Sequence, residues 1–153
     1  MTIDRIDKTI IHLLQEDASL SVGSIADKVS ISKTACWRRI QKLESDGVIR
    51  KRVVIMDPAQ LNVPLTVYIT IRTNQHTDRW AKTFKETIEY LPEITEIYRI
   101  SGNYDYLLKA HVTDMPGYDA LYKKLIKAQL LDITASFVME EIKHSTALPT
   151  KAI

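Results

Sequence analysis

The sequence predicts an α+β fold of two domains, and three observations support this prediction. The first fifty residues repeat apolar side chains every three or four positions, as amphipathic helices do. Residues 65–73 instead alternate apolar and polar side chains, as a half-buried strand does. Between these patterns, Asp57-Pro58 and the segment AQLNVP are typical of a turn and a linker. We therefore expect one domain in residues 1–50 and another in residues 65–153, joined by a strand and linker in residues 51–64.

The composition is that of a folded protein. The chain has 153 residues, of which 45% are apolar, so it can bury a core. Only four Gly and five Pro argue against disorder. No apolar run approaches the ~20 residues of a membrane span. The charged start MTIDRIDKTI lacks the apolar stretch of a signal peptide, and the single cysteine, Cys36, excludes an internal disulfide. We expect a cytoplasmic protein with no membrane partner.

Three short helices are predicted in the first domain. Asp4 is suited to cap the first helix, with Asp7 at its third position, and Ser21 is suited to cap the second. Ser32 is suited to cap the third helix, which Gly47 ends. The apolar stripes of the first two helices are Ile6, Ile10, Leu13 and Leu14, and Val22, Ile25, Ala26 and Val29.

The third helix is predicted to be amphipathic, with a basic polar face. Its buried side carries Cys36, Ile40 and Leu43. At about 100° per residue, its opposite side carries Thr34, Arg38, Gln41 and Lys42, with Trp37 at the edge. A short helix, a tight turn and a second helix with such a face form the helix-turn-helix arrangement, whose second helix enters the DNA major groove.

Positive charge is concentrated around this helix. The net charge is only +2, but residues 33–52 hold seven basic residues against Glu44 and Asp46, a net +5. Residues 65–153 hold eleven basic and eleven acidic residues. A local basic patch is the electrostatic signature of a phosphate-binding surface. The alternative is a solvated charged face.

A β-branched segment follows the third helix. VIRKRVVIMD, residues 48–57, is predicted to form a strand, which would be the wing of a winged helix-turn-helix domain. Its triplet Arg50-Lys51-Arg52 would then lie beside the phosphate backbone that the helix approaches.

The second domain repeats a strand–helix–strand pattern twice. The predicted strands are residues 65–73, 94–100, 106–112 and 132–142. The apolar stripes of the two helices between them are Trp80, Phe84, Ile88 and Leu91, and Tyr118, Leu121, Tyr122 and Leu125. This βαββαβ order is the ferredoxin-like arrangement.

A sheet with both helices on one face leaves its other face open. The residues expected on the open face are Tyr68, Phe137, Val138 and Met139. A partner subunit can cover such a mixture of polar and apolar side chains.

Four stretches of the chain occur in a familiar order and spacing. They are IDRIDKTIIHLLQED, IADKVSISKTACWRRIQKLESDGVI, SGNYDYLLKAHVTD and TASFVMEEIKHSTALP. With them the chain resembles the Lrp/AsnC family, the leucine-responsive or feast/famine regulators, over essentially its whole length. The resemblance implies that the N-terminal domain binds double-stranded DNA. It also implies that the C-terminal domain forms homodimers that assemble into tetramers or octamers.

The resemblance further implies an amino-acid effector. In the family it binds between dimers near a Gly-x-x-Asp turn, which is Gly102–Asp105 here. Two positions depart from the family pattern. Ser30-Ile31-Ser32 stands where similar proteins have Gly-Leu-Ser, so a positive φ at this turn would cost some backbone energy. Trp37 stands where many members have Leu, and Cys-Trp-Arg-Arg is similar to a branch of the family tied to cysteine catabolism.

The candidate DNA-binding residues lie on the third helix and just after it. Thr34, Arg38 and Gln41 are suited to base edges, since Arg pairs with guanine and Gln with adenine. Basic residues suited to phosphates position the protein without reading the sequence, and they are Lys33, Arg39, Lys42 and Arg50. The set also includes Ser32 and Trp37. The alternative for Arg39 is an ion pair with Glu44 or Asp46 on its own surface.

The candidate effector-binding residues are Ser101, Gly102, Asn103, Tyr104, Asp105, Thr134, Ala135 and Ser136. In this hypothesis the backbone N–H groups of the turn receive an α-carboxylate, and Asp105 receives an α-ammonium group. Residues 134–136 of the last strand would supply the other wall from a neighbouring dimer. The alternative is an ordinary turn, in which Gly and Asn serve a positive φ.

No residue pattern supports enzyme chemistry, a metal or a bound cofactor. The four histidines, at positions 12, 76, 111 and 144, are scattered singly, without metal-ligand spacing. Cys36 is expected to be a small buried hydrophobe. Two rival functions remain. One is an architectural DNA-binding protein without an effector, and the other is an amino-acid-metabolising enzyme on a ferredoxin-like fold.

Overall fold

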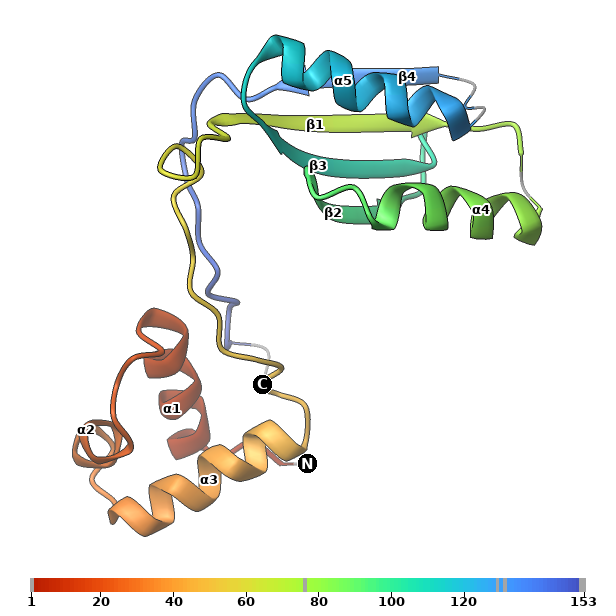
Figure 1. Cartoon of the computed structure of the whole chain (residues 1–153). Coiled ribbons are helices and arrows are strands. Elements are labelled where there is room, and N and C mark those ends of the chain that lie inside the picture. Colours follow the sequence, from red (N-terminus) through yellow and green to blue (C-terminus); the bar gives the residue numbers. More distant parts are fainter. Residues whose placement is uncertain (1, 76, 129, 131, 152–153) are drawn as a thin grey trace. The chain divides into compact units, whose positions relative to one another are not determined.

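The computed structural model describes residues 2–75, 77–128, 130 and 132–151. The chain forms two compact units (Figure 1). The first comprises residues up to 54 and those from 142 onward, and the second comprises residues 55–141. None of the helices in the described residues is long and apolar enough to cross a membrane.

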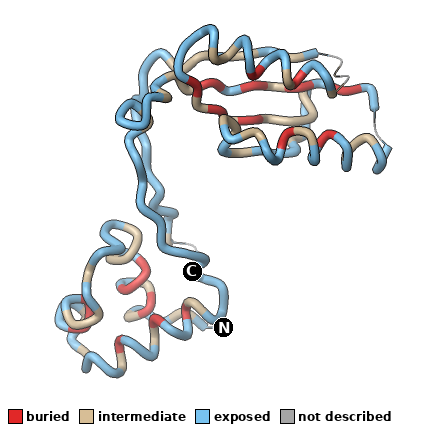
Figure 2. Tube along the Cα trace, viewed as in Figure 1, coloured by how far each residue is buried: buried red, intermediate tan, exposed pale blue. Residues whose placement is uncertain are grey.

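The first unit contains the three predicted helices, α1 (Arg5–Glu16), α2 (Val22–Lys28) and α3 (Lys33–Ser45). The predicted caps are confirmed. Asp4 and Asp7 form a reciprocal capping box at the start of α1, and the Ser21 and Ser32 side chains accept from backbone N–H groups of α2 and α3. The buried side chains form one core, coloured red on these helices in Figure 2: Ile10, Ile11, Ile25, Ala26, Cys36, Ile40 and Leu43.

The turn between α2 and α3 adopts the left-handed conformation without glycine. Ser30 has φ 56°, so the backbone cost anticipated from Ser30-Ile31-Ser32 is real. The Ile31 N–H donates to the Ala26 carbonyl at 3.1 Å, which tightens the turn. The turn therefore places α3 after α2 at the expense of local strain.

The predicted strand over residues 48–57 is wrong. The segment lies outside every strand, and Val53, Val54 and Ile55 are exposed by 59–84%. Ile49 packs against the first core and its N–H donates to the Leu43 carbonyl at 3.0 Å, while Arg52 pairs with Glu44 of α3 at 3.2 Å. A β-branched sequence forms a strand only where a neighbouring strand completes the hydrogen bonds, and none among the described residues does so here.

The second unit is the predicted βαββαβ domain. Its elements are β1 (Leu65–Arg72), α4 (Asp78–Glu89), β2 (Ile94–Arg99), β3 (Tyr106–Val112), α5 (Met115–Leu125), the short 3-10 helix η1 (Ile126–Ala128) and β4 (Asp132–Phe137). The strands form one antiparallel sheet in the order β2-β3-β1-β4. In this order β3 and β1 are the two central strands, and their buried side chains pack against α4 and α5.

The last strand is shorter than predicted, because β4 ends at Phe137 rather than at residue 142. Phe137 pairs with Val67 of β1, and the Val138 N–H donates to the Thr66 carbonyl at 3.0 Å. Because β1 begins at Leu65, which corresponds to Met139 in this register, residues beyond Met139 extend past the start of β1.

One face of the sheet is covered and the other is open. Val67, Ile69 and Ile71 of β1 are fully buried against α4 and α5, together with Phe84, Ile88, Leu108, Ala110, Val112, Leu121 and Leu125. Tyr68 on the open face is exposed, as predicted. The placement of Phe137 on that face is wrong, since its ring packs edge-on against Tyr118 of α5 at a centroid distance of 5.0 Å.

Gln15 of α1 holds the C-terminal segment. Its side-chain amide donates to the Leu148 carbonyl at 3.1 Å and accepts from the Leu148 N–H at 2.7 Å. This is the pairing that a neighbouring strand would provide. The sequence predicts residues 65–153 as one domain, whereas these contacts group residues 142–151 with the first unit.

Replacing Ser30 with Gly should stabilise the first unit. Glycine has no Cβ to strain the left-handed turn, so Ser30→Gly is expected to raise the free energy of unfolding by about 0.5–1 kcal/mol. Thermal unfolding measures the change. The matched control is Ser24→Gly inside α2, where glycine costs backbone entropy and should lower stability by up to about 1 kcal/mol. A lower melting temperature for Ser30→Gly would show that the positive φ of Ser30 does not destabilise the unit.

Candidate DNA-binding and effector sites

The polar face of α3 is exposed as predicted. Lys33, Thr34, Arg38 and Lys42 are solvent-exposed, and the Trp37 side chain is 52% exposed. Arg38 and Lys42 lie one helical turn apart, and neither takes part in an ion pair within the described residues. Their positive charges are therefore not neutralised by the domain itself.

Other predicted DNA-binding residues have partners within the first unit. The Ser32 hydroxyl accepts from the Ala35 N–H at 3.2 Å, so Ser32 acts as the cap of α3. The Gln41 amide donates to Glu44 at 2.9 Å. Arg50 is exposed beyond the end of α3. Most of the predicted residues thus lie on α3, but Ser32 and Gln41 already have hydrogen-bond partners within the first unit.

Arg39, predicted as a phosphate contact, is held by two carboxylates. Its Nη1 donates to Asp4 Oδ2 at 2.7 Å and to Asp7 Oδ1 at 2.8 Å. The N–H of Asp7, and after it the Arg39 guanidinium, hold the pKa of Asp4 below its usual range. These contacts favour a structural role for Arg39. They also show that its acidic partners are Asp4 and Asp7 rather than Glu44 or Asp46.

Residues Ser101–Asp105, the effector turn, connect β2 to β3. Gly102 has φ 121°, which explains why glycine stands there. The Asp105 N–H donates to the Ile71 carbonyl at 2.9 Å, and Asp105 Oδ2 accepts from the Thr73 N–H at 2.8 Å. One carboxylate oxygen of Asp105 therefore fastens the turn to the end of β1.

Arg72, which is not among the residues predicted from the sequence, also contacts the effector turn. Its Nε–H donates to the Asn103 carbonyl at 3.0 Å, and its guanidinium carbon lies 5.6 Å from the centroid of the Tyr104 ring. In the sequence, Arg72 is only the last polar position of an alternating strand. The turn lies more than twenty-five residues further on, so no local pattern links the two.

The three candidate residues of β4 do not share a face. Thr134 and Ser136 are exposed on the open face, where they pair in register with Thr70 and Tyr68 of β1. Ala135 points the other way and packs against the helix-covered core. Of the predicted wall, only Thr134 and Ser136 present side chains to a ligand on the open face.

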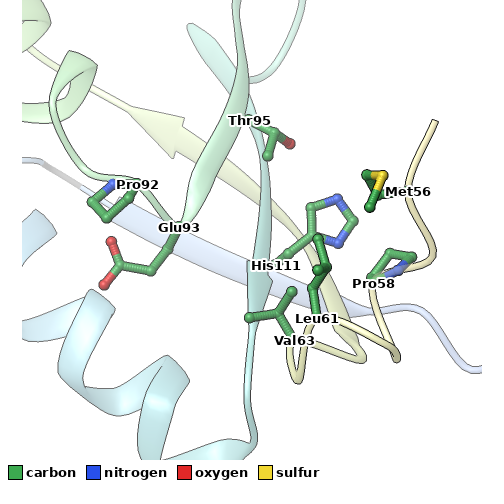
Figure 3. A pocket seen from close by; sticks show the side chains of 8 residues that line it. All are labelled: Met56, Pro58, Leu61, Val63, Pro92, Glu93, Thr95 and His111. Carbon is green, nitrogen blue, oxygen red and sulfur yellow. The ribbon is translucent and has the colours of Figure 1, made fainter. Parts of the chain in front are cut away.

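The described residues of the second unit include an apolar hollow and a smaller polar one. The larger, about 430 Å³, is lined mainly by apolar side chains from the linker and the start of β2 (Figure 3): Met56, Pro58, Leu61, Val63, Pro92, Glu93, Thr95 and His111. It contains no predicted site residue, and His111 pairs with Thr66, at the end of β1 opposite the effector turn. The smaller, about 70 Å³, is polar and includes Asp105 together with Thr77, Asp78 and Arg99.

The remaining reactive side chains have ordinary environments. Cys36 is fully buried, and burial raises the pKa of its thiol, which favours the packing role predicted for it. His12 lies 3.3 Å from Glu16 on the same helix. Burial lowers the pKa of His111. His76 lies outside the described residues, and within those residues no three potential ligands gather around a metal position.

A three-helix unit with an exposed basic helix, joined to a βαββαβ unit with an open sheet face, defines a DNA-binding regulatory protein. Family comparison agrees on both parts. A winged helix-turn-helix DNA-binding domain matches residues 3–50, and the Lrp/AsnC ligand-binding domain matches residues 66–148. The chain belongs to the Lrp/AsnC family of transcriptional regulators.

Relatives cover nearly the whole chain. The glutamate uptake regulatory protein of Zymomonas mobilis is 44% identical over 148 residues, which are 96% of this chain and 90% of that protein. The DNA-binding transcriptional activator DecR of Escherichia coli is 38% identical over 149 residues, 96% of this chain and 98% of that protein. A Neisseria meningitidis transcriptional regulator solved in complex with L-methionine superposes with a TM-score of 0.93 at 29% identity, covering 99% of both chains.

These matches decide the class of function. The chain is a DNA-binding transcriptional regulator with a ligand-binding domain, and its family consists of regulators rather than enzymes. The link between Cys-Trp-Arg-Arg and cysteine catabolism stays a prediction.

Arg39 and Arg38 are expected to behave differently when truncated. Arg39→Ala leaves Asp7, which is only 7% exposed, without its cation, and should lower the free energy of unfolding by about 1–3 kcal/mol. Arg38→Ala removes an exposed side chain and should change stability by less than about 0.5 kcal/mol. Thermal unfolding distinguishes the two.

Acidification adds a second check. Because the pKa of Asp4 is lowered in the folded state, its stabilisation is present above the usual carboxyl range and is lost as pH falls through the lowered value. The stability difference between wild type and Arg39→Ala should therefore shrink at acidic pH. An equal effect of Arg38→Ala and Arg39→Ala on stability would contradict the structural role of Arg39.

Proposed function

We propose that α3 reads a specific DNA sequence from the major groove and that a small amino acid, bound at the effector turn, controls this binding. The observation that carries the proposal is the exposed face of α3, where Arg38 and Lys42 have no ion-pair partner within the described residues. Uncompensated basic side chains on an amphipathic helix match a polyanion. Since such a regulator acts on genomic DNA, we place it in the cytoplasm.

The position and chemistry of each side chain on α3 indicate whether it contacts a base edge or a phosphate. Arg38, Gln41 and Thr34 face outward near the middle and start of the helix, where recognition helices contact base edges. Lys33 and Lys42 are suited to phosphates, as is Arg50 beyond the helix end. Arg39 is removed from the phosphate set because Asp4 and Asp7 occupy it.

An amino acid is the effector class that the comparisons support. The Neisseria relative was solved with L-methionine, and the Zymomonas relative is named for regulating glutamate uptake. In this chain the effector turn offers backbone N–H groups at Ser101–Tyr104 and an acidic side chain at Asp105. Thr134 and Ser136, exposed on β4, would supply hydroxyl groups from a neighbouring dimer.

Assembly is proposed as the link between the two activities. The open sheet face exposes Tyr68 and Tyr98 among polar side chains, and a second copy of the chain would bury them. Such homodimers would join into tetramers or octamers, which present several α3 helices to DNA at once. An effector that binds one assembly state more tightly then shifts DNA affinity by that difference.

Truncating Arg38 and Lys42 should weaken DNA binding in two distinguishable ways. Lys42→Ala should lower affinity for all sequences and reduce the dependence of log K on log salt concentration by about 1. Arg38→Ala should cost about 1–3 kcal/mol at the specific site and relax its sequence preference. Gel shift and footprinting on DNA upstream of the protein's own gene and its neighbours measure both effects.

The matched control is Arg79→Ala with Lys85→Ala, which removes the same two charges from the exposed side of α4. This control should leave specific binding intact. Binding that ignores sequence and survives Arg38→Ala with Lys42→Ala would reject the recognition role of α3. A regulator that binds DNA specifically but responds to no amino acid would instead be architectural.

A further inference from the structure

The end of β1 holds the effector turn through three consecutive residues. The Ile71 carbonyl accepts from the Asp105 N–H, the Arg72 side chain donates to the Asn103 carbonyl, and the Thr73 N–H donates to Asp105 Oδ2. Two of these bonds are made by the backbone of residues 71 and 73. They therefore do not depend on which side chains those two residues carry. The contact of Arg72 depends on its guanidinium group.

The guanidinium of Arg72 is held in place by one hydrogen bond, which involves its Nε–H and not its Nη groups. Its Nε–H is bound to the Asn103 carbonyl at 3.0 Å, and its plane is placed over the turn by the Tyr104 ring, 5.6 Å away. Arg72 is an exposed residue at the end of the strand. The Nη groups therefore remain for another acceptor, already held in the flat fork geometry that binds a carboxylate with two hydrogen bonds.

Arg72 takes part in no ion pair within the part of the domain that the structure describes. Asp132 of β4 is its partner in the sheet register, yet the two side chains form no ion pair. None of the ion pairs among the described residues includes Arg72. Asp105, the last residue of the turn, keeps one carboxylate oxygen, Oδ1, outside its bond to Thr73. The turn thus carries an anionic side chain and is contacted by a cationic one.

We propose that Arg72 binds the α-carboxylate of the effector through its Nη groups. The inference rests on the proposed function, which puts an amino acid at this turn, and it adds the residue and the chemical group that recognise it. Opposite charges at Arg72 and Asp105 match the opposite charges of a free amino acid's α-carboxylate and α-ammonium. An amino acid whose carboxylate is converted to an amide should lose the contact with Arg72.

The test compares free amino acids with their α-carboxamides. Thermal unfolding of the full chain against the twenty L-amino acids selects those that bind. Calorimetric titration then gives Kd for each selected amino acid and for its α-carboxamide, for example L-methionine and L-methioninamide. The variants are Arg72→Gln, Arg72→Lys and, as a matched control, Arg79→Gln, which removes an exposed arginine of the same domain. Their melting temperatures without ligand show that each variant is folded.

The wild type should bind the free acid at least about tenfold more tightly than the carboxamide, the effect expected of a charge-assisted bidentate contact. Arg72→Gln should lose this preference, Arg72→Lys should keep only part of it because lysine lacks the fork, and Arg79→Gln should keep all of it. If Arg72 merely orders the turn, Arg72→Gln weakens acid and carboxamide equally, and the assignment is overturned while the proposed function stands. If no amino acid stabilises the wild type, the amino-acid effector and the role of Arg72 both fall.

Discussion

The ion pairs between Arg39 and the capping box of α1 connect the fold of the first unit to its DNA-binding surface. Arg39 lies on α3 between the buried side, where Cys36 and Ile40 pack, and the exposed side, where Arg38 points outward. Its bonds to Asp4 and Asp7 fix α3 against the first turn of α1. Because Asp4 and Asp7 also satisfy the N-terminal N–H groups of α1, one small cluster both begins a helix and orients the next. The outward face of α3 depends on that orientation.

The effector turn depends on the second unit in a similar way. A β-hairpin connection with a glycine at positive φ is free to move unless other bonds hold it. Here the end of β1, one of the two central strands of the sheet, holds the turn through backbone and side-chain contacts. A ligand at the turn therefore acts on a rigid part of the domain.

Features with a local cause could be predicted from the sequence. The helix caps at Asp4, Ser21 and Ser32, the βαββαβ order and the strained Ser30 turn all follow from neighbouring residues, and the structure confirms them. Features that depend on distant partners could not be predicted. Residues 48–57 are β-branched but lack a neighbouring strand, and Arg39 finds its carboxylates more than thirty residues earlier in the chain. The sheet face on which Phe137 and Ala135 lie could not be predicted either. It depends on the register between β4 and β1, which the alternation of a short strand does not determine. Gln15 and Arg72 acquire their roles only through contacts far along the sequence.

The proposed coupling between amino-acid binding and DNA binding is reciprocal, so it can be measured from either ligand. The amino acid that most stabilises the protein is titrated by calorimetry into the protein alone and into the protein saturated with its upstream DNA. We expect the two Kd values for the amino acid to differ, and by the same factor by which that amino acid changes the Kd for DNA. Identical amino-acid Kd values with and without DNA would contradict it, because a ligand with equal affinity for both states shifts neither.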